Sequence, residues 1–271
     1  WNTALAWVCG DSCVWKPSEK SALCSIACQN IWNEVAAVND VPAELSCVVN
    51  GLADIGEMMS NDPMVPLVSA TGSTRMGKAV SKAVAGRLGR SLLELGGNNA
   101  IIIAPDADLK MVVPAAVFGA VGTCGQRCTS TRRMIIHHSI YDQVKTVLKN
   151  AYGQLKIGNP MDESNHVGPL TDRGAVQMYL DALQAVKDQG GTFVVEGGLL
   201  EGAGYESGCY VSPSIAEASN DLAIVQHETF APLVYLMKYD TLDEAIALQN
   251  GVAQGLSSAI MTNSVQEAEW F

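Results

Sequence analysis

The order of apolar and helix-like segments limits the folds open to this chain more than any other feature. Short segments that are apolar on both faces, such as residues 45–51, 64–72 and 98–105, alternate with segments of helical periodicity. A strand buried on both faces needs helices above and below it, as in parallel sheets with crossover connections. The sequence therefore predicts an α/β fold, with a doubly wound parallel sheet in residues 1–96 and a second α/β domain in residues 97–271.

Charge and hydropathy exclude several classes of partner. Asp and Glu number 28 against 17 Lys and Arg, which gives a net charge of −11 and leaves no basic stripe for nucleic acid. The longest apolar run, Met111–Cys124, contains Pro114 and is shorter than the ~20 residues that a membrane span needs. No secretory leader is recognisable, and we expect a cytoplasmic protein. Because the chain lacks an initial Met and stops just after a helix start at Ser264, we also expect it to be incomplete.

Six of the eight cysteines form three pairs spaced four residues apart: Cys9 and Cys13, Cys24 and Cys28, and Cys124 and Cys128. Structural zinc sites favour two residues between ligands and recruit histidines, which here are scattered, so we expect no metal. A chain with this much apolar composition also needs no disulfide framework. We expect the cysteines that have apolar neighbours to be small buried hydrophobes: Cys9, Cys24, Cys28 and Cys47.

Residues 121–131, VGTCGQRCTST, contain a cysteine of a different kind. Cys128 lies beyond the apolar run and directly beside Arg127, whereas Cys124 is still on that run and is expected to pack inward. A neighbouring guanidinium and free backbone amides favour the thiolate, which is the reactive form of cysteine. Cys128 is thus a candidate nucleophile, and the alternative is a loop cysteine without a role.

The segment SATGSTRMGK, residues 69–78, predicts an anion site at the start of a helix. A strand ends at Gly72 and a helix opens through Ser73, so free amides and the positive end of the helix dipole meet where a phosphate can bind. The spacing is neither a P-loop nor GxGxxG. The alternative is a capped helix without a ligand.

The segment WKPSEK, residues 15–20, leaves a predicted strand for a helix, at the carboxyl edge where α/β sheets bind nucleotides. Lys16 and Glu19 are a cation and an acceptor suited to the two hydroxyls of an adenosine ribose. Glu19 would also repel a 2′-phosphate, which favours NAD over NADP. The alternative is a helix cap with a salt bridge between the two side chains.

Glu94 is the candidate general base. It lies near the end of an apolar strand and before two glycines, in LLELGGNN. A carboxylate between apolar neighbours is costly to ionise, which suits a base that works near neutrality. The alternative is a glutamate that reaches water at the tip of the strand.

Five motifs follow one another along the chain: KPSE (16–19), TGSTRMG (71–77), LELGG (93–97), GQRC (125–128) and ETFAP (228–232). Their identity and order resemble the aldehyde dehydrogenase superfamily over the whole chain. Within it, LELGGNNAII, GTCGQRCTSTRR and HETFAP are most similar to the α-aminoadipic semialdehyde dehydrogenase branch. The resemblance implies an NAD-binding domain in residues 1–96 and a catalytic domain in residues 97–271, each incomplete.

The same resemblance implies a role for each candidate residue. Cys128 would be the nucleophile and Glu94 the base, while Arg127 would grip a carboxylate at the far end of the substrate. The cofactor NAD would be bound by three groups of residues: Lys16 and Glu19 at the adenosine ribose, Gly72 and Ser73 at the pyrophosphate, and Glu228 and Phe230 at the nicotinamide and its ribose. The superfamily's oxyanion-binding Asn is expected in a segment before Trp1.

These roles imply NAD-dependent oxidation of an aldehyde to a carboxylic acid, through a thiohemiacetal and then a thioester of Cys128. The substrate would be an amino- or carboxy-substituted semialdehyde, as in lysine breakdown, and the protein a homodimer or homotetramer. Three alternatives stay open: a CoA-acylating aldehyde dehydrogenase, a non-catalytic member kept for structure or binding, and a bare nucleotide-binding module. Glu94 favours hydrolysis of the thioester over its transfer to CoA.

Overall fold

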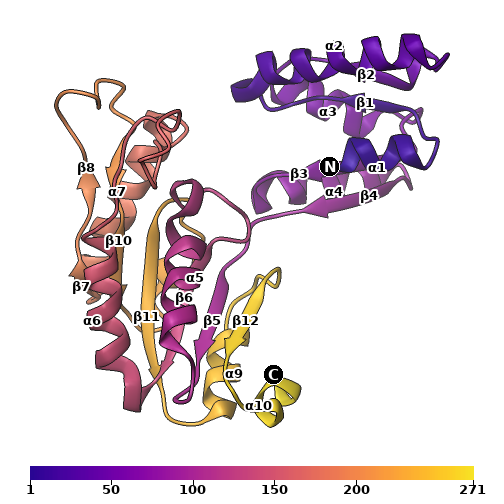
Figure 1. The fold of residues 1–271 in the computed structure, drawn as a ribbon. Helices are drawn as coiled ribbons and strands as arrows, with labels where there is room; N and C mark the ends of the chain where they lie inside the picture. Colours follow the sequence, from indigo (N-terminus) through magenta and orange to yellow (C-terminus); the bar gives the residue numbers. More distant parts are fainter. The chain divides into compact units, whose positions relative to one another are not determined.

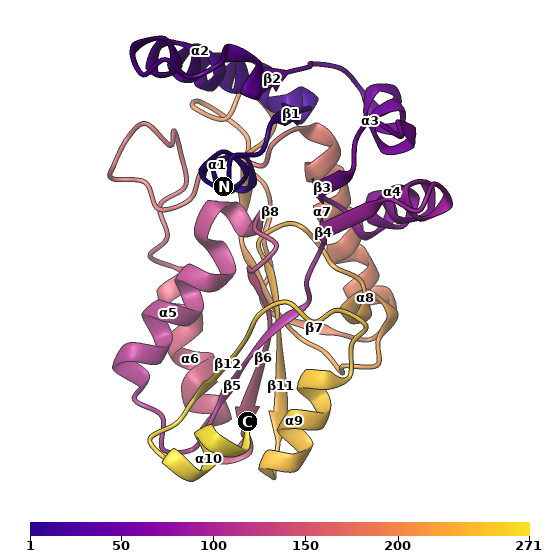
Figure 2. The same ribbon diagram turned by 90° about the vertical axis from the view of Figure 1, so that its right-hand side faces the viewer.

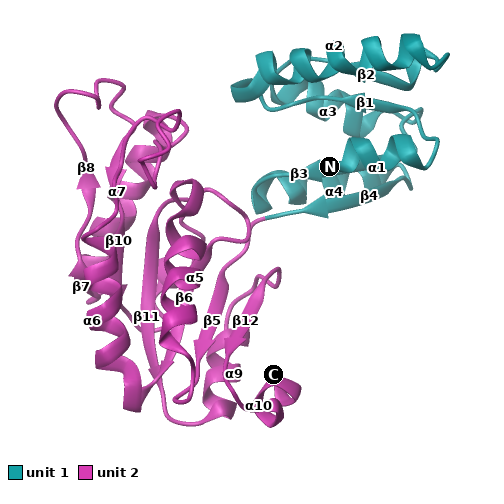
Figure 3. Ribbon diagram, viewed as in Figure 1, with its two compact units in different colours: residues 1–95 teal, residues 96–271 magenta.

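The structure, a computed structural model, describes every residue from Trp1 to Phe271. The chain divides into two compact units, Trp1–Leu95 and Gly96–Phe271, which Figure 3 colours separately. Strands and helices alternate in both units, and all strand pairings are parallel except those of β7 with β10 and of β8 with β9. The predicted α/β class is confirmed.

Unit 1 contains two pairs of parallel strands. β1 (Cys13–Trp15) pairs with β2 (Ser46–Val48), and β3 (Leu67–Thr71) pairs with β4 (Arg90–Glu94). The helices of this unit are α1 (Asn2–Val8), α2 (Ala22–Val38), α3 (Ala53–Asn61) and α4 (Thr74–Gly86). The sequence pattern predicts one sheet in this unit, whereas no backbone hydrogen bonds join the β1–β2 pair to the β3–β4 pair. With only three residues each, β1 and β2 offer few backbone groups to a further strand.

The four cysteines predicted to be buried in unit 1 are exposed, so that prediction is wrong: Cys9, Cys24, Cys28 and Cys47. Helix α2 shows the reason, because it has 17 residues and lies beside strands of three. Strands about 10 Å long cannot cover a helix about 25 Å long. Only Ser25 and Ala36 of α2 are buried, and apolar neighbours in the sequence did not indicate burial.

Unit 2 is built on a six-stranded sheet with the order β12-β5-β6-β11-β10-β7 (Figure 1). Its strands are β5 (Asn99–Ile103), β6 (Thr131–His137), β7 (Thr192–Val195), β10 (Ser214–Glu217), β11 (Leu233–Tyr239) and β12 (Ser258–Met261). A small separate ladder joins β8 (Gly198–Leu199) to β9 (Val211–Ser212).

Helices cover both faces of this sheet, with α5 and α6 on one face and α9 on the other (Figure 2). The helices of unit 2 are α5 (Leu109–Val121), α6 (Tyr141–Tyr152), α7 (Arg173–Asp188), α8 (Ala223–Gln226), α9 (Leu242–Asn250) and α10 (Val265–Trp270). Among all helices of the chain, none combines the length and the apolar character that crossing a membrane requires.

The central strands of unit 2 form its core because they are apolar on both faces. Ile102 in β5, Ile135 in β6 and Val234 in β11 are all fully buried. Burying one such side chain stabilises the fold by about 1.5–3 kcal/mol. The apolar segment 98–105 therefore predicted β5 correctly.

Candidate active site

Three sequence motifs meet at one edge of the sheet in unit 2. The two glycines that end the LELGG motif precede β5, the GQRC motif precedes β6, and the ETFAP motif leads into β11. Strands β5, β6 and β11 are neighbours and run parallel, so their amino ends lie side by side (Figure 1). Loops that are far apart in the sequence are thereby brought together by the strand order.

Cys124, just before the GQRC motif, and Cys128, its last residue, differ in environment. Cys124 is fully buried, and burial raises the pKa of its thiol to about 12. The inward packing predicted for Cys124 is confirmed. Cys128 is only partly buried and is not sealed in the core.

A left-handed turn, which includes Cys124, lies between the end of helix α5 and Cys128. Thr123, Cys124 and Gly125 all have positive φ, at 53°, 54° and 66°. Two of them are not glycine, and a positive φ is rare and strained for a β-branched residue such as Thr123. At Gly125 a side chain would collide with the backbone of Ala231, so the turn packs directly on the ETFAP segment.

Asn99 fixes the backbone around Cys128 and was not singled out by sequence analysis. Its Nδ2 donates to the carbonyl of Cys128 and to that of Ser130, each at 2.8 Å. Its Oδ1 accepts the N–H of Ser257 at 3.0 Å. All the polar atoms of this buried amide are used within the fold, and the only signal in the sequence is a pair of asparagines, Asn98 and Asn99, after two glycines.

The backbone N–H of Cys128 donates to no acceptor in the chain, whereas the N–H groups of Gln126 and Ser130 do. Gln126 N donates to Thr123 O, and Ser130 N donates to Arg127 O. A free amide beside a thiol is the arrangement that an oxyanion-binding donor requires.

Glu228 lies against Gly96 and Gly97, the two glycines of the LELGG motif. Its Oε1 accepts the N–H of Gly97 at 3.1 Å, and a side chain at Gly96 would collide with its Oε2. The carboxylate is mostly buried, with 18% of the side chain exposed. Phe230, two residues further on, is 37% exposed. The ribose contact predicted for Glu228 would have to use its remaining lone pairs.

Arg127 lies over the start of its own loop. Its Nε donates to Thr123 Oγ1 at 2.9 Å, and its guanidinium carbon lies 4.7 Å from the ring centroid of Phe118. A side chain at Gly122 would overlap it. The terminal nitrogens Nη1 and Nη2 donate to no acceptor in the chain. A carboxylate can therefore take both, in the bidentate geometry that guanidinium groups favour.

The predicted pyrophosphate site in unit 1 is a capped helix start. Ser73 Oγ accepts the N–H of Met76 at 3.2 Å and is the N-cap of α4. The first amides of the helix, at Thr74 and Arg75, have no intrahelical partner and remain able to bind an anion. A side chain at Gly72 would meet only the flexible end of Met76, so crowding does not explain this glycine.

The predicted ribose pair is not a salt bridge. Lys16 Nζ donates to the carbonyls of Pro17 at 2.7 Å and Gly51 at 3.1 Å. Glu19 is exposed at the start of a 3₁₀ turn that Ser18 caps. Because an ammonium has three donors, Lys16 keeps one N–H for a ligand, and the donor set fits a ribose.

Glu94 is exposed at the end of β4. The apolar surroundings predicted for this carboxylate are not found, and the alternative of a glutamate that reaches water describes its position. A base that activates water still needs contact with water, so exposure leaves that role open.

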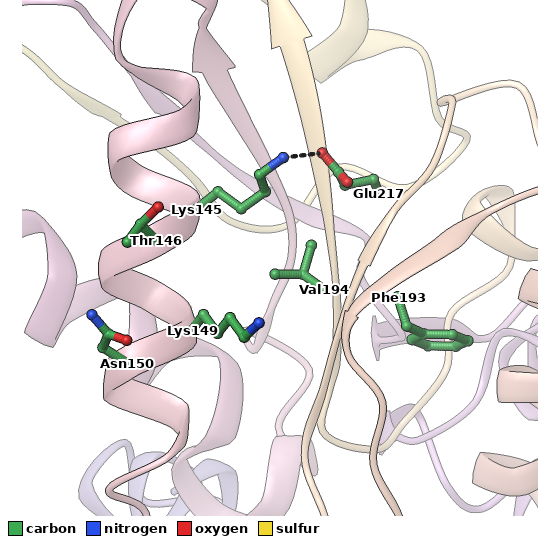
Figure 4. Close-up of a pocket in the computed structure, with 7 residues that line it drawn as sticks. All are labelled: Lys145, Thr146, Lys149, Asn150, Phe193, Val194 and Glu217. Atoms are coloured by element: carbon green, nitrogen blue, oxygen red, sulfur yellow. Dashed lines mark hydrogen bonds and ion pairs between the residues drawn. The ribbon is translucent and has the colours of Figure 1, made fainter.

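A separate pocket of about 530 Å³ in unit 2 contains none of these candidates (Figure 4). There Lys145 Nζ contacts Glu217 Oε1 at 3.1 Å and Asp142 Oδ1 at 3.3 Å. The pocket is lined by seven residues: Lys145, Thr146, Lys149, Asn150, Phe193, Val194 and Glu217.

Comparison with known proteins gives the class. The profile of the Aldehyde dehydrogenase family matches residues 1–271, and the chain belongs to this family. It is 47% identical over 266 residues to α-aminoadipic semialdehyde dehydrogenase of Bos taurus, covering 98% of the chain and 49% of that protein. It is 45% identical over 262 residues to aldehyde dehydrogenase family 7 member A1 of Pisum sativum, covering 97% and 51%. The chain spans about half the length of the curated relatives it matches.

Solved structures agree with the fold. Betaine aldehyde dehydrogenase from Staphylococcus aureus, in complex with NAD⁺, superimposes with a TM-score of 0.91 at 30% identity, covering 96% of this chain and 51% of that one. A 3,6-anhydro-L-galactose dehydrogenase, in complex with NADP, has the same TM-score and identity and covers 97% and 55%. The neighbours thus include complexes with both dinucleotides.

Proposed function

We propose that the complete protein oxidises an aldehyde with NAD, through Cys128, and that its substrate is a semialdehyde with a carboxylate far from the reacting carbon. The loop around Cys128 carries this proposal. It presents a partly exposed cysteine beside an unbonded amide, and Asn99 and Gly125 fix the loop to two neighbouring segments. Pre-organised donors of this kind are needed where negative charge develops.

The chemistry assigns one task to each residue. The Cys128 thiolate adds to the aldehyde carbon, and the oxygen that becomes negative is held by the Cys128 N–H. NAD, when bound, supplies the acceptor for the hydride that leaves this carbon, and a thioester of Cys128 remains. Glu94 then takes a proton from a water molecule, which attacks the thioester and releases the carboxylic acid and the thiol.

The substrate class follows from Arg127. Its two terminal nitrogens have no acceptor in the chain, and its Nε is fixed by Thr123. A charge-assisted pair with a carboxylate is worth about 1.5–3 kcal/mol, or about 10- to 100-fold in binding. The similarity to α-aminoadipic semialdehyde dehydrogenase of Bos taurus points to the same kind of substrate.

NAD is the proposed cofactor because of Glu19. The free amides at Thr74 and Arg75 suit a pyrophosphate, and Lys16 with Glu19 suits the hydroxyls of a ribose. A 2′-phosphate beside the Glu19 carboxylate would be repelled. Because matched structures include both dinucleotides, the preference is measured as the ratio of kcat/KM for NAD and NADP.

The test compares aminoadipate semialdehyde with hexanal in the complete protein and in its Arg127→Met variant. We expect Arg127→Met to raise KM for the semialdehyde about 10- to 100-fold and to leave hexanal within about threefold. Reduced nicotinamide is followed by absorbance, and the product is identified as free acid. Equal use of both aldehydes by the unmodified protein would defeat the substrate proposal. An acyl-CoA product, formed only with added CoA, would favour the acylating alternative.

A further inference from the structure

Two adjacent buried arginines occupy β6 directly after the GQRC loop. Arg132 and Arg133 are 2% and 1% exposed, and successive strand residues point to opposite faces. A buried guanidinium is costly unless its N–H groups find acceptors. Arg133 finds four of them: the carbonyls of Asn98, Leu248 and Gln249, and Asn220 Oδ1. These contacts account for Arg133 as a residue of the fold.

Arg132 instead bridges the two loops of the candidate site. Its Nη1 donates to the carbonyl of Ala231 at 2.9 Å, and its Nη2 donates to the carbonyl of Arg127 at 3.3 Å. The same Nη2 lies 3.9 Å from Glu228 Oε1, and the guanidinium carbon lies 5.5 Å from the ring centroid of Phe230. One side chain thus touches both the residue before Cys128 and the segment expected at the nicotinamide.

The third nitrogen of the Arg132 guanidinium, Nε, donates to no acceptor. This nitrogen is buried, and leaving such a group unpaired costs about 1–3 kcal/mol. Burial lowers the pKa of Arg132 to about 10, while Glu228, Tyr235 and Cys128 act in the opposite direction. The guanidinium therefore remains charged at neutral pH. Arg132 thus keeps a buried positive charge with one nitrogen unpaired, unlike Arg133, so stabilisation of the fold does not by itself account for it.

We infer that Arg132 is a positioning residue, which sets the Cys128 loop at a fixed distance from the Glu228–Ala231 segment. This inference rests on the proposed function. Arg132 acts on the nucleophile through the Arg127 carbonyl, and on the segment expected at the nicotinamide through Ala231 and Glu228. A lysine has one nitrogen and cannot donate from two separated positions of a planar fork, so Arg132→Lys keeps the charge and breaks the bridge.

The experiment compares Arg132→Lys with Arg133→Lys in the complete protein, since both replace a buried arginine of the same strand. We expect both to lower the melting temperature. Only Arg132→Lys should slow alkylation of Cys128 by iodoacetamide, lower kcat and raise KM for NAD, each by about tenfold or more, because a misplacement of ~1 Å can cost ~100-fold. Arg133→Lys should stay within about threefold in all three.

The outcomes separate the two proposals. If the unmodified protein oxidises aldehydes and Arg132→Lys matches Arg133→Lys in alkylation, kcat and KM, the positioning role is wrong and the proposed function stands. If the unmodified protein oxidises no aldehyde, the proposed function fails, while a slowed alkylation in Arg132→Lys still supports the bridge. Arg132→Gln replaces the lysine variant if that one does not fold. Failure of both to fold, with Arg133→Lys folded, would show a structural role only.

Discussion

Asn99 shows how a single residue can determine the backbone of a site without touching a substrate. It binds two carbonyls of the Cys128 loop and one amide 158 residues away. Its immediate sequence context does not distinguish it, because asparagines that follow glycines are common in turns and Asn98 stands beside it. Its partners become neighbours only through the order of the strands, and the sequence alone could not identify it.

Removing this amide should weaken the unit measurably. Asn99→Ala leaves three backbone groups without partners, one in a buried and two in part-buried hydrogen bonds, and we expect the free energy of unfolding to fall by about 3 kcal/mol. Asn39→Ala is the control, because the exposed Asn39 amide bonds only the Val35 carbonyl in its own helix, and it should change stability by less than about 0.5 kcal/mol. Urea unfolding measures both. A similar small effect at both positions would contradict the clamping role of Asn99.

Cys124 gives a pH dependence with a definite sign. Its pKa rises from 9.0 in the unfolded chain to about 12 when folded, so between these values the unfolded state has lost the proton that the folded state keeps. Stability therefore falls as pH rises through this window. Between pH 9 and 10 we expect a loss of about 1 kcal/mol from this thiol.

The measurement is urea unfolding at pH 9 and pH 10 for the unmodified protein and for Cys124→Ala. The variant should lose less stability over that step, since its titrating thiol is gone. Tyrosines whose pKa is raised by burial also lose stability over this step, but they are present in both proteins, so the difference between the two losses isolates the Cys124 thiol. Equal losses in the two proteins would show that burial of the Cys124 thiol does not govern the dependence.

At the scale of elements, the sequence predicted the type and order of helices and strands well, but it predicted poorly which of their surfaces are exposed. The apolar runs marked the central strands of unit 2, and the helix starts at Ser73 and Ser264 cap as expected. The surface of α2 was mispredicted, because exposure depends on what lies opposite a helix and not on its own residues. The meeting of three motif loops at the amino ends of β5, β6 and β11 depends on strand order, which local patterns do not encode.

The contact between two of these loops can be tested through a glycine. Gly125 and Gly204 both have positive φ, at 66° and 89°, but only Gly125 has backbone within reach of an added side chain. Gly204→Ala should cost about 1 kcal/mol from strain alone. Gly125→Ala should cost at least about 3 kcal/mol, since it adds a collision with Ala231, and it should reduce turnover sharply. Equal costs in thermal unfolding would mean that the two loops do not pack as described.

At the scale of the whole molecule, the candidate residues divide between the two compact units. Unit 1 carries the groups proposed for the adenosine half of NAD together with Glu94, and unit 2 carries Cys128, Arg127 and the ETFAP segment. Five ordered motifs were enough to indicate the family from sequence, and the family is confirmed over residues 1–271. The role of each residue stays a prediction, because roles depend on ligands and on chemistry.

The account depends most on a covalent bond between Cys128 and the substrate carbon. The most direct measurement is acid quenching of the complete protein with NAD and aminoadipate semialdehyde, followed by mass spectrometry of its peptides, in the Glu94→Gln variant. Because this variant should hydrolyse the thioester slowly, we expect the acyl mass on the peptide that contains Cys128, only when NAD is present. An acyl group on another residue, or full turnover by Cys128→Ala, would contradict the account.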